Sequence, residues 1–125
     1  MTTGMEVWTR AMELLGYTAA DGTVDPRQSA EQLRRGLAVI NQVFADLWPL
    51  EHEGAPAPLQ TLEEPIPLCA KTIGDVMPYG AAMFLAAAEG DAAAQALYAG
   101  LYGGKRQAAR HPDRRRLDRQ PSPLL

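Results

Sequence analysis

The side chains best suited to metal binding or nucleophilic catalysis are few and lie far apart in this sequence. His52 and His111 have no cysteine and no second histidine near them, which argues against a zinc-type ligand set. Cys69 stands between apolar neighbours with no base close by, as small core cysteines do. Ser29 and Ser122 lie outside any G-x-S-x-G sequence. These positions predict no catalytic residue and no metal ligand.

Three further groups of polar residues have simpler interpretations than a reactive site. Glu51-His52-Glu53 contains cation ligands, but adjacent side chains in a loop rarely converge on one ion, so we expect them to be solvated. We expect Glu63-Glu64 to be surface charge rather than an acid and base pair. The segment 100–106 lacks the G-x-x-x-x-G-K-[ST] spacing of a phosphate-binding loop and follows no predicted strand. We therefore expect neither enzymatic activity nor a cofactor.

The composition is that of one globular domain. The chain has 125 residues, of which 46% are hydrophobic and 22% are charged. A single cysteine excludes the disulfide-stapled and zinc-finger classes. The longest uncharged runs, such as the 13 residues of 76–88, are shorter than the ~20 residues that cross a bilayer. We therefore expect no membrane partner.

Charge is divided unevenly along the chain. Residues 1–100 hold 5 basic and 13 acidic side chains, a net charge of −8, whereas residues 101–125 hold 7 basic and 2 acidic, a net charge of +5. Because 110–125 has too few apolar residues to fold alone, we expect a helical domain at 1–109 and a basic tail at 110–125. The tail is expected to meet a negatively charged partner, either nucleic acid, a membrane surface or an acidic patch on another protein, and the simpler alternative is a solvated tail. The seven basic residues are Lys105, Arg106, Arg110, Arg114, Arg115, Arg116 and Arg119.

Apolar residues spaced by three and four predict two amphipathic helices in the first 48 residues. The T-x-x-E sequence at 3–6 has the form of a capping box before a helix over 5–15. A second helix is expected over Pro26–Trp48, capped by Asp25 and stopped by Pro49. At ~1.5 Å per residue this helix is roughly 34 Å long, the length of a small domain. Its apolar stripe consists of Leu33, Leu37, Ile40, Phe44 and Leu47.

The remaining chain predicts a proline-rich loop and two more helices. Four prolines within 50–67 exclude a regular helix there, so we expect an ordered, partly extended loop. Asp75 is expected to cap a helix that reaches about residue 89 and is buried on most sides, because 79–88 is apolar all round. Gly90-Asp91 then ends this helix and caps another over 92–110, with a break expected near Gly103.

These elements predict an all-α fold, a small four-helix subunit with a long central helix, a proline-rich loop and an extended basic C-terminal tail. Thirteen of the 21 residues from 80 to 100 are Ala or Gly, and such small side chains bury little area. We therefore expect contacts with other subunits to supply part of the stability.

Four segments occur in an order that resembles one protein family. They are 14–18 with Asp21-Gly22, then 38–48, then 77–86 with Glu89-Gly90-Asp91, and finally Tyr102 with Lys105-Arg106. Together they are similar to the small head-tail connector, or adaptor, proteins of tailed bacteriophages and prophages. The resemblance covers about residues 5–106. The loop 54–58 and the segment 111–120 do not match the family pattern.

The resemblance implies a structural role in the virion, at the interface between head and tail, after assembly in the host cytoplasm. It implies a homo-oligomeric ring, a dodecamer matching the portal, that extends the DNA channel and joins the portal protein to a tail-side completion protein. It also implies that the basic residues from Lys105 to Arg119 contact the portal or a neighbouring subunit, with transient contact to channel DNA as a further possibility. The alternative is a small helical nucleic-acid-binding protein that grips phosphates with Arg114, Arg115 and Arg116, although its acidic body argues against it.

Overall fold

The computed structural model describes residues 2–16 and 26–109, with side chains of α2 described from residue 33 on. Within these ranges the fold is all-α, as predicted, and a lone bridge between Thr3 and Pro65 is the only β pairing. No helix in the described part is long and apolar enough to cross a membrane. The elements are α1 (Gly4–Leu15), α2 (Pro26–Leu47), the 3-10 turn η1 (Trp48–Leu50), α3 (Ala70–Asp75), α4 (Met77–Ala88) and α5 (Ala92–Ala109).

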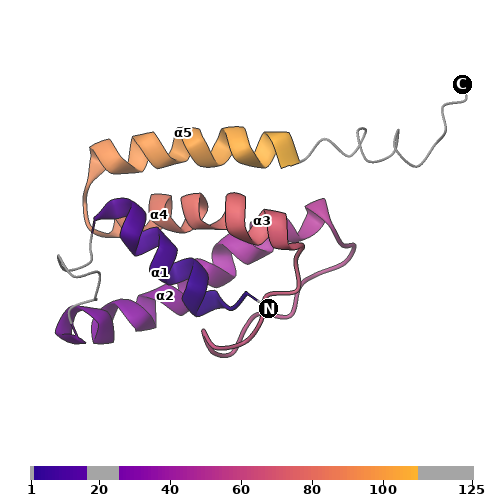
Figure 1. Cartoon of the computed structure of the whole chain (residues 1–125), viewed down its shortest axis with the longest axis horizontal. Coiled ribbons are helices and arrows are strands. Elements are labelled where there is room, and N and C mark those ends of the chain that lie inside the picture. Colours follow the sequence, from indigo (N-terminus) through magenta and orange to yellow (C-terminus); the bar gives the residue numbers. More distant parts are fainter. Residues whose placement is uncertain (1, 17–25, 110–125) are drawn as a thin grey trace, which may run out of the picture.

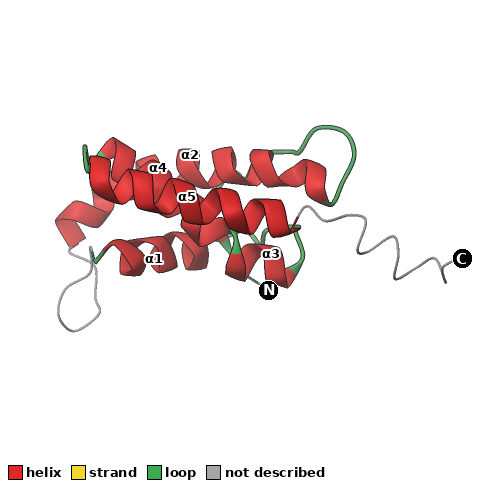
Figure 2. Ribbon diagram, turned by 90° about the horizontal axis from the view of Figure 1, so that it is seen from above, coloured by secondary structure: helices red, strands yellow, loops and turns green. Residues whose placement is uncertain are grey.

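Helix α4 lies at the centre of the packing and contacts α1, α2, α3 and α5. Figure 1 shows α5 lying along one side of α4, with α1 and α2 on the opposite side. The view from above in Figure 2 shows no other described element covering the outer side of α5. The long helix α2 therefore lies at the edge of the domain. Helix α4, which is rich in small side chains, lies in its middle.

The first helix begins and ends as the sequence predicts. The Thr3 side chain accepts a hydrogen bond from the Glu6 backbone, and the Glu6 carboxylate accepts one from the Thr3 N–H, which completes the capping box. Gly16 ends the helix with φ 74°, a left-handed conformation that favours glycine. The predicted turn after it, at 17–24, and the cap at Asp25 lie outside the described residues.

The apolar stripe of α2 is confirmed in its C-terminal half and shifted in its N-terminal half. Ile40, Phe44 and Leu47 are fully buried, whereas Leu33 and Leu37 are only partly buried. The reason lies one residue before Leu37. The indole of Trp8 packs directly on Gly36, where an added Cβ would lie 2.9 Å from a ring carbon, so the buried stripe passes through Gly36.

The start of α4 differs from the prediction that Asp75 caps it. Asp75 is the last residue of α3, and Val76 occupies the N-cap position in a right-handed helical conformation without a side-chain hydrogen bond. The Asp75 carboxylate turns instead to Lys105 of α5, 3.2 Å away. The single residue between the two helices leaves no extended segment in which a side-chain cap could form. The rest of the prediction is confirmed, because α4 is buried on most sides.

Helix α5 begins as predicted but has no break at Gly103. Gly90 ends α4 with φ 75°, and the Asp91 carboxylate accepts a hydrogen bond from the Ala94 N–H, 3.0 Å away. The helix then runs unbroken to Ala109. Side-chain anchors before and after the glycines, at Tyr102 and Arg106, hold this turn on the domain and offset the weak helix propensity of glycine.

The proline-rich segment between η1 and α3 is ordered and partly extended, as predicted. Its residues Leu59, Leu62 and Ile66 are buried, so it contributes to the core. The Asn41 amide on α2 bonds both the N–H and the carbonyl of Leu59, at 2.8 and 3.0 Å. The Met5 N–H donates to the Leu62 carbonyl at 2.7 Å, which ties the segment to α1.

The two halves of the α2 stripe predict different costs of truncation. Phe44→Ala should lower the free energy of unfolding by about 3–5 kcal/mol, because it empties a fully buried site. Leu37→Ala should cost clearly less, because Leu37 is only partly buried. Urea denaturation of both variants and the parent measures this. Equal costs would contradict the shifted stripe.

Candidate interaction surfaces

Three side chains from two helices meet at the C-terminal half of α5. The Tyr102 hydroxyl donates a hydrogen bond to Asp46 Oδ2 at 2.5 Å, and Arg106 Nε donates to the same oxygen at 2.9 Å. Arg106 Nη2 also donates to the Asp46 carbonyl at 3.0 Å. Tyr102 and Arg106 lie four residues apart, so both reach the carboxylate from one face of α5. The cluster fastens α5 to the end of α2.

The Tyr102 ring lies in a space that only glycine leaves open. An added Cβ at Gly80 of α4 would lie 2.7 Å from Tyr102 Cε1, closer than packed atoms approach. Tyr102 is 6% exposed and is the only residue of α5 in the buried class. Burial in the first place, and then the Asp46 carboxylate, raise the pKa of the Tyr102 phenol above its ordinary value.

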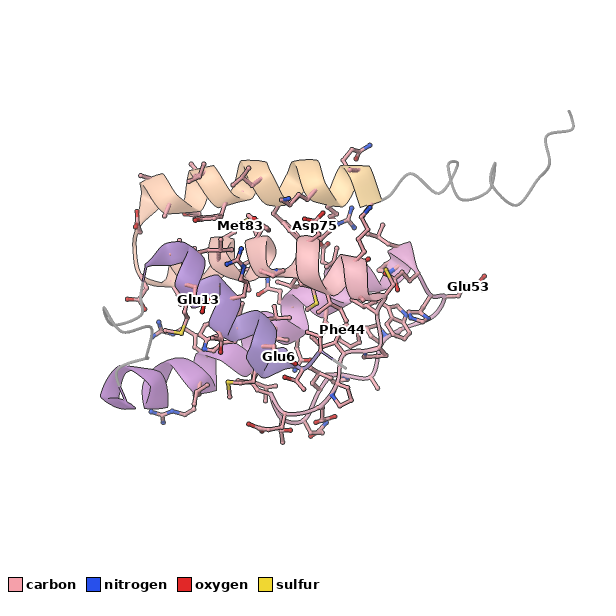
Figure 3. All side chains as sticks on the ribbon, in the orientation of Figure 1. Glu6, Glu13, Phe44, Glu53, Asp75 and Met83 are labelled. Atoms are coloured by element: carbon pink, nitrogen blue, oxygen red, sulfur yellow. The ribbon has the colours of Figure 1, made fainter. Side chains whose placement is uncertain are left out.

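Lys105 makes a second attachment of α5. Its Nζ lies 3.2 Å from Asp75 Oδ1 and 4.6 Å from the centre of the Tyr79 ring. Figure 3 shows Asp75 on the side of α3 and α4 that faces α5. Lys105 and Arg106, two of the predicted partner-contact residues, are therefore brought together and paired with acidic residues of their own chain. The other five, Arg110, Arg114, Arg115, Arg116 and Arg119, lie outside the described residues.

The exposed residues of α5 between 92 and 104 are uncharged and, apart from Gln95, apolar. Residues 92–104 contain no charged side chain, and Leu97 and Leu101 are 57% and 40% exposed. They are the exposed large hydrophobic residues of the described part. We call the exposed residues Ala93, Ala96, Leu97, Gly100, Leu101 and Gly104 the outer face of α5. Uncovered apolar helix faces of this kind are typical of protein contact surfaces.

The corner between η1 and α3 is held by polar contacts that the sequence did not indicate. One Glu51 carboxylate oxygen accepts from the Cys69 N–H at 2.7 Å, and the other accepts from the Thr72 hydroxyl at 2.6 Å. The His52 ring stacks on Trp48 with 4.0 Å between centroids, and its Nε2 lies 2.9 Å from the Pro67 carbonyl. The prediction that these side chains are solvated is wrong for Glu51, which is half-buried and hydrogen-bonded, whereas His52 and Glu53 are exposed as predicted, and Glu53 points away from the body (Figure 3).

The predicted place of Cys69 in the core is also wrong. Its side chain is exposed, because Cys69 is the N-cap residue of α3 at an outward turn. Its thiol lies 3.2 Å from the Thr72 hydroxyl, and no imidazole, lysine or carboxylate of the described residues bonds to the thiol. The geometry gives it no partner that would activate a nucleophile.

The sequence predicts no metal site and no acid and base pair at Glu63-Glu64. Among them, no group of three or more His, Cys, Asp and Glu side chains is close enough to hold a metal ion. His111 lies outside this range. The Glu64 carboxylate accepts hydrogen bonds from the Gln60 and Thr61 N–H groups, both at 2.6 Å, so it serves the loop, whereas Glu63 is exposed.

Sequence reasoning missed Asp46 and Gly80, the partners of Tyr102. The one available signal was the spacing of Tyr102 and Arg106, which places an aromatic hydroxyl and a guanidinium on one face of a helix. Nothing in that spacing indicates which of thirteen acidic residues in 1–100 would lie opposite. Only the packing of α2, α4 and α5 selects Asp46.

The buried phenol predicts a stability difference that depends on pH. Tyr102→Phe removes one hydrogen bond to a half-exposed carboxylate and should cost about 1 kcal/mol at neutral pH. Because the folded-state pKa of Tyr102 is raised, the unfolded chain loses this proton first as the pH rises above about 10, and the parent then loses stability. In urea denaturation the advantage of the parent over the variant at about pH 12 should be smaller than at pH 8, with the loss beginning near pH 10. An advantage that stays constant over this range would contradict the assignment.

Searches against protein-family models, curated protein sequences and solved structures each found no match to this chain.

Proposed function

We propose that this chain is a structural subunit of a head-tail connector of a tailed bacteriophage or prophage. The proposal rests on one observation: residues from three of the segments that resemble this family meet in one contact cluster. Asp46 belongs to the segment 38–48, Gly80 to 77–86, and Tyr102 and Arg106 to the last segment, and these four residues form one contact cluster. The cluster joins three of the four resembling segments, so the resemblance includes residues that hold the helices of this domain together.

The packing of the chain supports an assembled rather than a solitary subunit. Half of the residues of helix α4 are Gly or Ala, so α4 itself offers little apolar area to the helices around it. The outer face of α5 stays apolar and uncovered within the described part. A subunit that completes its burial against neighbours fits a homo-oligomeric ring under the portal, which extends the DNA channel and receives a tail-side protein. In this proposal the protein is not an enzyme and resides in the virion.

The basic tail is proposed as the attachment to the portal or to an adjacent subunit. Lys105 and Arg106 are already paired with Asp75 and Asp46, so the arginines from Arg110 onward are the residues available for this role. DNA in the channel must slide, and many simultaneous phosphate contacts would hold it back. A protein partner is therefore favoured over DNA, with contact to DNA limited to a passing encounter.

Removing three arginines tests the assignment of the tail. Changing Arg114, Arg115 and Arg116 together to Ala should weaken attachment to portal-bearing heads by roughly tenfold or more, because several charged contacts are lost at once. The helical circular dichroism spectrum and the urea midpoint should not change, since these residues follow the helical domain. Attachment is measured by co-sedimentation of the protein with heads.

A matched control removes the same charge from the body. The triple variant Arg10→Ala, Arg34→Ala and Lys71→Ala loses three exposed positive charges and should attach as the parent does. If the tail variant also attaches like the parent, the tail is not the attachment element. If it instead loses affinity for free duplex DNA while the parent shows no binding to heads, the nucleic-acid-binding alternative replaces the connector proposal.

A further inference from the structure

Helix α5 is attached to the domain along one narrow side. Twelve of its 18 residues are exposed and Tyr102 alone is buried, whereas seven of the 12 residues of α4 are buried. Gly100, Gly103 and Gly104 also lower its helix propensity. An isolated helix of this length is marginal in water even for better helix-forming residues. We therefore expect α5 to lose its helical structure when it leaves the domain.

The polar attachments of α5 reach three other helices. The Tyr98 hydroxyl donates to the Leu14 carbonyl of α1 at 2.8 Å, and the contacts at Asp46 and of Lys105 reach α2 and α3. All of these contacts break together when α5 leaves. Tyr102 is the only buried residue that α5 adds to the core, so the other buried core side chains come from the rest of the chain.

The connection between α4 and α5 has the form of a hinge. Gly90 has φ 75°, and glycine adopts such conformations without the steric cost that a side chain brings. The ion pair of Glu89 with Arg35, at 2.8 Å, holds the end of α4 on α2. The Asp91 cap belongs to α5, because it bonds the Ala94 N–H. A rotation at Gly90 can therefore move α5 while α4 stays in place.

We propose that α5 is a strap that leaves the domain and unwinds as one unit, while α1, α2, α3 and α4 stay folded. A helix with few buried contacts opens at a lower free energy than the core does. Docked, α5 is about 27 Å long. Unwound, its 18 residues can extend to roughly 60 Å, so opening lengthens the reach of the residues that follow it. This inference does not rest on the connector proposal, because it uses only the burial and the contacts of α5.

Hydrogen exchange read by mass spectrometry measures the opening of each helix separately. In the parent, the amides of 95–106 should open together and be at least roughly tenfold less protected than those of α4. Asp46→Asn weakens the hydrogen bonds from Tyr102 and Arg106, which exist only while α5 is docked. The amides of α5 should therefore exchange roughly tenfold faster in this variant than in the parent.

The matched control for this change is Glu51→Gln. The Glu51 carboxylate also accepts two hydrogen bonds, but at the corner between η1 and α3, which keeps its contacts when α5 opens. Glu51→Gln should leave the exchange of α5 unchanged. It should speed the exchange of α4, because its contacts are lost only when the whole domain unfolds.

A methyl group at Gly80 tests whether α5 opens without the rest of the domain. Gly80→Ala places a Cβ 2.7 Å from the Tyr102 ring, which blocks the docked position, whereas α4 gains helix propensity. The amides of α5 should then exchange nearly as fast as those of an unfolded peptide, while α1 and α4 stay protected. Gly74→Ala in α3 adds the same methyl where no atom lies within 4 Å, and α5 should stay as protected as in the parent.

Four outcomes would overturn the strap. The amides of α5 would be as protected as those of α4 in the parent, or they would exchange in a gradient from the C-terminal end, as in a fraying helix. Asp46→Asn and Glu51→Gln would change the exchange of α5 equally. Gly80→Ala would leave α5 protected or would remove the protection of α1 and α4 as well.

Discussion

The fold depends on the contact of the Tyr102 ring with the backbone of Gly80. This contact requires glycine on α4, and it carries the Tyr102 hydroxyl to Asp46 on α2, so one side chain joins three helices. Tyr102 is the only buried residue of α5, and the helix is also held by the ion pairs of Lys105 and Arg106 and by Tyr98, whose hydroxyl donates to the Leu14 carbonyl of α1 at 2.8 Å. The Tyr102 ring packs tightly on Gly80, and its hydroxyl and Arg106 bond the Asp46 carboxylate at the edge of the cluster. These contacts together give α5 one defined position.

Small side chains at the centre explain much of the remaining architecture. A middle helix with Gly80, Ala81, Ala82 and Ala86 in its buried positions lets neighbouring helices approach closely, but it offers little apolar area to each of them. Helix α4 itself supplies the large buried residues Met77 and Leu85, and Trp8, Ile40 and Phe44 from α1 and α2 supply others. Trp8 in turn requires Gly36, a second site where glycine permits close approach. Among the described residues the buried Trp8 indole N–H finds no hydrogen-bond partner, which is a cost of this close packing.

Several charged side chains of the domain form ion pairs within the chain. Arg35 pairs with Glu89 at 2.8 Å, and Lys105 and Arg106 pair with Asp75 and Asp46. Such half-exposed pairs each add little stability, but they orient the ends of helices. Residues 1–100 hold more acidic than basic side chains, so their net charge stays negative when these pairs have formed. A basic tail and an acidic body are complementary within one chain and between copies, which suits a subunit of an assembly.

The sequence alone determined the helices wherever local signals agree, as in the capping box of Thr3 and Glu6, the stop at Gly16 and the turn at Gly90-Asp91. Periodicity likewise identified Ile40, Phe44 and Leu47 as core. Only tertiary structure decided which side of α5 faces inward, that Asp75 pairs with Lys105, and that Asp46 receives Tyr102. The reason is physical: caps and periodicity depend on neighbours within a turn or two, whereas these contacts join residues 30 and 56 positions apart. They form only once the helices are packed, with Gly80 letting the Tyr102 ring approach α4.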